Sequence, residues 1–214
     1  MGKISQGILG GFSGRVGSVV GGNWKGIDYM RVRAASISNP QTPGQVGQRT
    51  KFSTVLQFLQ PVKGFIKVGF RNYAIKMTEF NSAMSYNVQN AIIGDGTDFI
   101  IDFEAVLLSR GGLTAALNPA ATSEVAGSVK FTWVDNSVDG NAKATDRAMV
   151  LVYNPTRNEA IFVTDGSARS AGLHTLTVPN QYSGDTVQAY IAFISADGKE
   201  VSNSRYIGSV EVAK

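Results

Sequence analysis

From Pro119 onward, short apolar segments alternate with polar turns, and this pattern constrains the fold more than any other feature of the chain. In Ser128–Val134, every second residue (Val129, Phe131 and Trp133) is a large apolar one, which predicts a strand with one buried face. Further strands are expected at Arg147–Tyr153, Glu159–Thr164, Leu173–Val178, Asp185–Ser195 and Val201–Val212. Short strands at this spacing are typical of an antiparallel β-sandwich.

The same region resembles a fibronectin type III domain. Such domains carry a tryptophan on an early strand, a leucine and proline before a tyrosine-bearing strand, and then a turn rich in glycine and serine. The matching residues are Trp133, Leu176, Pro179, Tyr190, Gly198 and Ser202–Ser204. Immunoglobulin-like domains share much of this pattern, and Gly184-Asp185 departs from it, which leaves the tyrosine corner unassigned. The resemblance implies a sandwich over roughly residues 119–213 and offers no catalytic residues.

The N-terminal part has a different character. Nine glycines fall within the first 26 residues, and glycine can neither fill a core nor be ordered without a large loss of backbone entropy. A flexible arm is therefore expected, followed by a β-hairpin over Arg15–Arg33. Because a two-stranded ribbon is marginally stable by itself, this hairpin needs another surface, in its own subunit or in a neighbour.

Three helices are predicted in the middle of the chain. The first starts at Thr42, a capping residue followed by Pro43, and runs to about Gln60. A shorter helix follows Pro61 over Val62–Phe70, and a third runs from Thr78 to Ile92. The predicted fold class is α+β. Residues 1–118 would form a glycine-rich arm, hairpin and helical unit, and residues 119–214 an immunoglobulin- or fibronectin III-like sandwich.

The N-terminal and middle parts resemble a family of Bacteroidota proteins of unknown function. The resemblance rests on the glycine-rich start and on Asn39-Pro-x-Thr-x-x-Gln45 followed by Arg49-x-x-Phe52. It covers nearly the whole chain and implies a helical middle and an immunoglobulin-like end. The shorter Asn-Pro-x-Thr-x-x-Gln-x-x-x-Arg element is also similar to stretches in small phage structural proteins.

The net charge of +4 is unevenly distributed. Residues 1–94 carry eleven Lys or Arg and two Asp or Glu, a net +9, whereas residues 95–214 carry nine and fourteen, a net −5. Such a split favours either two units with different partners or head-to-tail attraction between subunits.

No recognisable catalytic or cofactor constellation is present, so the chain is expected not to be an enzyme and to bind no cofactor. It has no cysteine, and any histidine chemistry would depend on His174, which is interpreted as an exposed strand residue. The glycines do not match a phosphate-binding loop. Neither Asp95–Glu104 nor Asp135–Asp146 has the spacing of the twelve-residue calcium loop. A signal peptide and a membrane span are not expected, which favours a cytoplasmic or virion location.

The leading hypothesis is a non-enzymatic structural or assembly protein, an oligomeric component of a virion or prophage-derived particle. The predicted oligomer interface comprises Gly10, Gly11, Phe12, Val19, Val20, Trp24 and Tyr29. Two alternatives remain open. One is a module that recognises a glycan or protein through the loops Asp135–Asp146 and Asp165–Ala171. The other is a protein that binds nucleic acid non-specifically, and its predicted contacts are Arg15, Lys25, Arg31 and Arg33.

Overall fold

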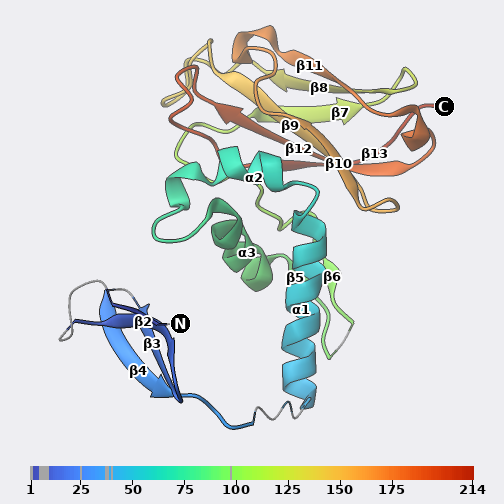
Figure 1. The fold of residues 1–214 in the computed structure, drawn as a ribbon. Coiled ribbons are helices and arrows are strands. Elements are labelled where there is room, and N and C mark those ends of the chain that lie inside the picture. Colours follow the sequence, from blue (N-terminus) through green and yellow to red (C-terminus); the bar gives the residue numbers. More distant parts are fainter. Residues whose placement is uncertain (1, 5–9, 25, 37–38, 40, 97) are drawn as a thin grey trace. The chain divides into compact units, whose positions relative to one another are not determined.

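The computed structural model describes residues 2–4, 10–24, 26–36, 39, 41–96 and 98–214 (Figure 1). The chain divides into two compact units, Met1–Gln41 and Thr42–Lys214.

The first unit contains one antiparallel sheet. Its strands are β1 (Lys3–Ile4), β2 (Phe12–Val16), β3 (Val19–Trp24) and β4 (Ile27–Val32), in the order β1-β2-β3-β4. The turn between β2 and β3 is only two residues long, and it contains Gly17 at a positive φ of 60°. Glycine adopts this conformation without the steric cost that a Cβ would bring, which suits it to tight hairpin turns.

The second unit begins with three α-helices at the positions that the sequence predicts. They are α1 (Pro43–Leu59), α2 (Lys63–Gly69) and α3 (Glu79–Asn90). The Thr42 hydroxyl accepts the Gln45 N–H at 3.4 Å, and the Thr78 hydroxyl accepts the Asn81 N–H at 3.2 Å, so both predicted caps form. Among the described residues, none of the helices is long and apolar enough to cross a membrane.

Two larger antiparallel sheets follow the helices. One has the order β10-β9-β12-β13 and the other β11-β8-β7. The strands are β7 (Leu117–Thr122), β8 (Ser128–Val134), β9 (Arg147–Asn154), β10 (Glu159–Val163), β11 (Leu173–Thr177), β12 (Thr186–Ile194) and β13 (Arg205–Glu211). A short pair, β5 (Ile92–Ile93) with β6 (Ile100–Ile101), lies after α3. Helices and antiparallel sheets occur together, as the α+β class requires.

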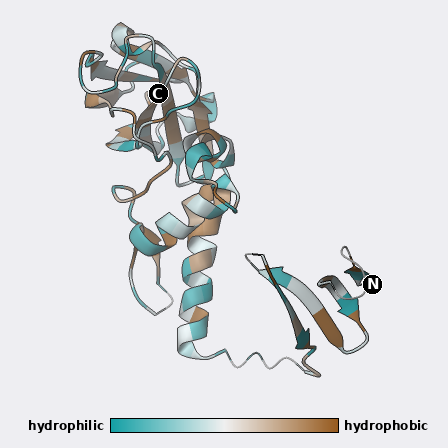
Figure 2. Cartoon of the chain, turned by 90° about the vertical axis from the view of Figure 1, so that its left-hand side faces the viewer, coloured by the Kyte–Doolittle hydropathy of each residue, from teal (hydrophilic) through white to brown (hydrophobic). Residues whose placement is uncertain are grey.

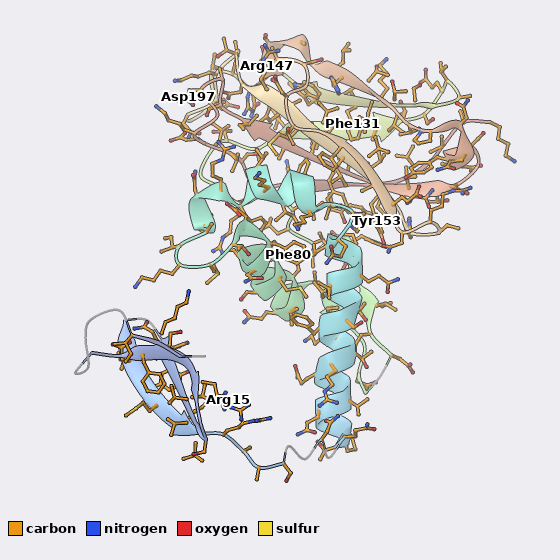
Figure 3. The ribbon with its side chains drawn as sticks, in the orientation of Figure 1. Arg15, Phe80, Phe131, Arg147, Tyr153 and Asp197 are labelled. Atoms are coloured by element: carbon orange, nitrogen blue, oxygen red, sulfur yellow. The ribbon has the colours of Figure 1, made fainter. Side chains whose placement is uncertain are left out.

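The two large sheets pack face to face around an inner core. Phe131 and Trp133 from β8 meet Val150 from β9 and Ile191 and Phe193 from β12. The Trp133 and Phe193 rings contact edge to face with centroids 5.5 Å apart. Phe131 lies between the sheets in Figure 3. The alternation in Ser128–Val134 therefore marks a buried face, as predicted.

The four-stranded sheet also has an outer core, because the helices cover its other face. Met149, Leu151 and Tyr153 of β9 alternate with the inner residues and pack against the helices. Phe58 of α1 meets Tyr153 edge to face at 4.8 Å, and Phe65 of α2 packs against β10. Tyr153 points toward the helices in Figure 3. Strands β9 and β12 are thus buried on both faces, which explains their nearly continuous apolar sequences.

This shared core changes the domain division. The sequence predicts a boundary near residue 118, but the helices and the sheets form one compact unit that starts at Thr42. The segment before the sheets is also tied to α3, since the buried Asn87 side chain accepts the Leu107 N–H and donates to its carbonyl, both at 2.9 Å. The boundary between the two compact units falls between Gln41 and Thr42.

Candidate functional site

Register and strand alternation divide the side chains of the N-terminal sheet between two faces. Val19 lies opposite Val32, and Gly21 lies opposite Met30, so these residues share one face. Their neighbours Val20 and Arg31 form a pair on the other face. Since side chains alternate strictly along a strand, the whole sheet can be assigned in this way.

The first of these surfaces is here called the apolar face. It comprises Ile4, Phe12, Val16, Val19, Met30 and Val32. Met30 is 71% exposed and Val32 75% exposed. The Phe12 ring lies over Gly21, where an added Cβ would come within 2.7 Å of it. Within the described part of this unit no apolar side chain is buried, although Figure 2 shows hydrophobic positions on its strands.

The opposite surface is here called the basic face. It comprises Lys3, Arg15, Val20, Trp24, Ile27, Tyr29 and Arg31. Tyr29 lies across its strand partner Gly22, where an added Cβ would approach the ring to 3.0 Å. Arg15, Val20 and Arg31 form one cross-strand row. Arg15 and Arg31 line a hollow of about 480 Å³ together with Arg33, which follows β4.

The residues predicted for an oligomer interface do not form one surface. Phe12 and Val19 lie on the apolar face, whereas Val20, Trp24 and Tyr29 lie on the basic face. Gly10 and Gly11 lead into β2, and Gly11 faces Asp28 so closely that a Cβ would overlap the carboxyl group. Of the predicted nucleic-acid contacts, the structure groups Arg15, Arg31 and Arg33, and Lys25 lies outside the described residues.

Four apolar-face residues are missing from the sequence prediction, namely Ile4, Val16, Met30 and Val32. Residues Ile27–Val32 mix apolar and polar side chains on both faces, so that alternation alone gives no single buried side. The sequence does not display the register between β3 and β4. That register places Met30 opposite Gly21 and Val32 opposite Val19.

The two units differ sharply in net charge. Residues 1–41 carry five Lys or Arg and one acidic residue, Asp28, a net +4, and residues 42–214 carry fifteen of each sign. The whole net charge of the chain therefore belongs to the first unit. Asp28 accepts a hydrogen bond from the Asn23 side chain at 2.8 Å and lies on the side of the apolar face.

The sandwich loops that were candidates for ligand recognition are joined to each other. Arg169, from the second loop, forms a buried ion pair with Asp146, from the first, at 3.2 Å. Arg169 also donates to the Asn136 side chain at 2.7 Å. Its guanidinium stacks 3.8 Å from the Phe193 ring centroid. Burial lowers the pKa of Arg169, and the Asp146 carboxylate opposes that shift. These contacts hold the loops against the inner core.

His174 is half-buried rather than exposed as the sequence suggests. Its Nδ1 accepts the Ser167 N–H at 3.2 Å, and the Ser167 hydroxyl lies 3.0 Å from the same nitrogen. Burial lowers the pKa of His174 below its ordinary value of 6.5. Among the residues that the structure describes, no cluster of three His, Cys, Asp or Glu side chains could hold a metal ion.

The fold and the two faces of the N-terminal sheet define a two-unit protein. A small sheet with exposed faces precedes a pair of packed sheets that helices cover on one side. Residues 11–208 match the model of the family of unknown function DUF6266, and the chain belongs to that family. No curated protein matches the chain. Among solved structures, it is similar to the fibronectin type III domain of human collagen alpha-1(XX). The identity is 13% and the TM-score 0.34, over 48% of this chain and 89% of that domain.

Proposed function

We propose that this protein is a non-enzymatic assembly protein that forms a homo-oligomer through the apolar face of its N-terminal sheet. The observation that carries the proposal is the exposure of that face in a unit whose described residues bury no apolar side chain. A small sheet needs a covered hydrophobic face to be stable. Contiguous exposed apolar surface is also a common mark of a protein–protein contact.

A second copy is the partner that the chemistry of the face favours. Two apolar faces packed together would bury Met30 and Val32 of both copies, and the cationic side chains would point outward on both sides. Among the described residues of the sheet, only Asp28 is charged on the apolar side, and its hydrogen bond with Asn23 satisfies one of its oxygens. Lys3, Arg15 and Arg31 of the two copies would therefore lie on opposite surfaces of the pair, where salt screens their repulsion.

The second unit supplies a rigid body for such an assembly. Its strands β7–β13 form a three-plus-four arrangement, which supports assigning them to a fibronectin III-like sandwich. The setting we propose is the head, neck or tail of a virion or prophage-derived particle. Support comes from the Asn39–Arg49 element and its similarity to phage structural proteins. Mass spectrometry of gradient-purified particles tests this setting, and absence of the protein from them would refute it.

Size-exclusion chromatography with light scattering tests the assembly. The monomer mass is 22.8 kDa, and the wild-type chain should run at twice that mass or more. Fully burying a methionine contributes about 1.5–3 kcal/mol, so Met30→Asp in both copies of a pair should weaken association by about 100-fold or more. Val138→Asp is the matched control, because Val138 is 92% exposed on the second unit. A wild-type monomer at high concentration would overturn the proposal.

A further inference from the structure

The proposed assembly covers the apolar face and leaves the basic face exposed to solvent. Three arginines, Arg15, Arg31 and Arg33, surround the hollow of about 480 Å³ on this side of the sheet, together with Ser36. Adjacent strands lie about 4.8 Å apart. Arg15 and Arg31 therefore project from backbone positions about 10 Å apart, with Val20 between them. Two cations at this separation can each meet a different phosphate of an extended polyanion.

Two aromatic side chains lie on the same face. Tyr29 is 47% exposed and Trp24 63% exposed. The Tyr29 ring lies against Gly22 on its inner side, so its outer side is presented to solvent. Trp24 pairs with Ile27 at the end of the same two strands. Flat aromatic rings beside arginines are the components with which proteins hold unpaired bases.

The net positive charge of residues 1–41 favours an anionic partner. Lys3 adds a further cation to the face, and none of the described residues on this face is acidic. The single acid of residues 1–41, Asp28, lies on the apolar side. A ligand on the basic face would therefore meet no carboxylate from the described residues of this face.

We propose that the basic face binds single-stranded nucleic acid. Arg15, Arg31 and Arg33 would contact phosphates, and bases would stack on Tyr29 and Trp24. Recognition of this kind does not depend on sequence, since every base has a flat face and every nucleotide a phosphate. The inference concerns the side opposite the oligomer contact and stands apart from the proposed function.

Fluorescence anisotropy of the full-length protein with a labelled 20-nucleotide oligothymidine tests the proposal. Removing two phosphate contacts in Arg15→Ala/Arg31→Ala should reduce the slope of log K against log salt by about 1.4, at about 0.7 per contact for single strands. Arg15→Lys/Arg31→Lys should keep the wild-type slope. Lys130→Ala removes an exposed cation from the second unit and is the matched control.

The aromatic variants separate nucleic acid from other polyanions. Trp24→Ala and Tyr29→Ala should each weaken oligothymidine binding about tenfold and leave binding of poly-glutamate unchanged. Equal affinity for poly-glutamate and oligothymidine, or binding that neither aromatic variant alters, would overturn the proposal. Light scattering on the same variants should give the wild-type mass. The inference and the assembly can therefore fail separately, and circular dichroism checks that each variant is folded.

Discussion

Replacing Arg169 tests how the second unit is held together. Its guanidinium is fully buried and reaches three acceptors: Asp146 at 3.2 Å, the Asn136 side chain at 2.7 Å and the Thr114 carbonyl at 2.9 Å. Its own carbonyl accepts the Trp133 indole N–H at 2.7 Å. Arg169→Met keeps much of the side-chain volume over the Phe193 ring and removes every charged hydrogen bond.

The expected loss of stability in Arg169→Met follows from the carboxylate that loses its partner. The Asp146 carboxylate would remain buried, with the Lys143 N–H as its one remaining hydrogen-bond donor, at 2.8 Å. Removing one partner of a buried ion pair costs about 3–5 kcal/mol because the other charge is left uncompensated. In a protein of this size, that corresponds to a fall in melting temperature of about 6–20 °C.

Urea denaturation followed by Trp fluorescence measures this change, with Arg147→Met as the control. Arg147 and Asp165 form an exposed pair at 3.6 Å, so their loss should cost less than about 1 kcal/mol. In the double variant Asp146→Asn/Arg169→Met, a coupling energy of about 1–3 kcal/mol should appear, because neither charge is left alone. Equal costs at Arg169 and Arg147 would refute the reasoning.

Two further predictions concern the same unit. Asn87→Leu should lower the free energy of unfolding, measured in urea, by about 2–4 kcal/mol, since it removes both hydrogen bonds to Leu107 and leaves part-buried backbone groups unpaired. Asn90→Leu, on the exposed side of α3, should cost less than about 1 kcal/mol. The folded protein binds fewer protons at His174 than the unfolded chain, because burial lowers its pKa, so stability should fall as pH drops below about 6.5. His174→Gln should flatten the profile in that window, and unchanged pH dependence would contradict the prediction. The carboxyls with lowered pKa, Asp185 and Asp197, lose their contribution only below about 3.8, outside that window.

Much of the second unit was predictable, because its signals are local. Thr42 and Thr78 mark helix starts through their own hydroxyls, and the alternation in Ser128–Val134 reports one buried face. The continuous apolar runs in β9 and β12 are a further local signal. They show that one sheet is covered on both sides, which would have placed the helices and the sheets in one unit.

The rest depended on contacts that sequence does not display. Arg169 lies in a loop that was expected to be exposed. The residues around it do not predict a buried ion pair with Asp146, 23 residues away. In the N-terminal sheet, the division into an apolar and a basic face comes from the register of β2, β3 and β4. Val20 and Val19 look equivalent in the sequence but point to opposite sides.

The central claim is that a second copy covers the apolar face, and the reactivity of a cysteine placed there tests it most directly. The natural chain has no cysteine, so Met30→Cys introduces a unique thiol, and Val138→Cys provides an exposed control. At high protein concentration, maleimide should label position 30 at least tenfold more slowly than position 138, and the two rates should converge on dilution. Equal labelling rates at every concentration would contradict the claim.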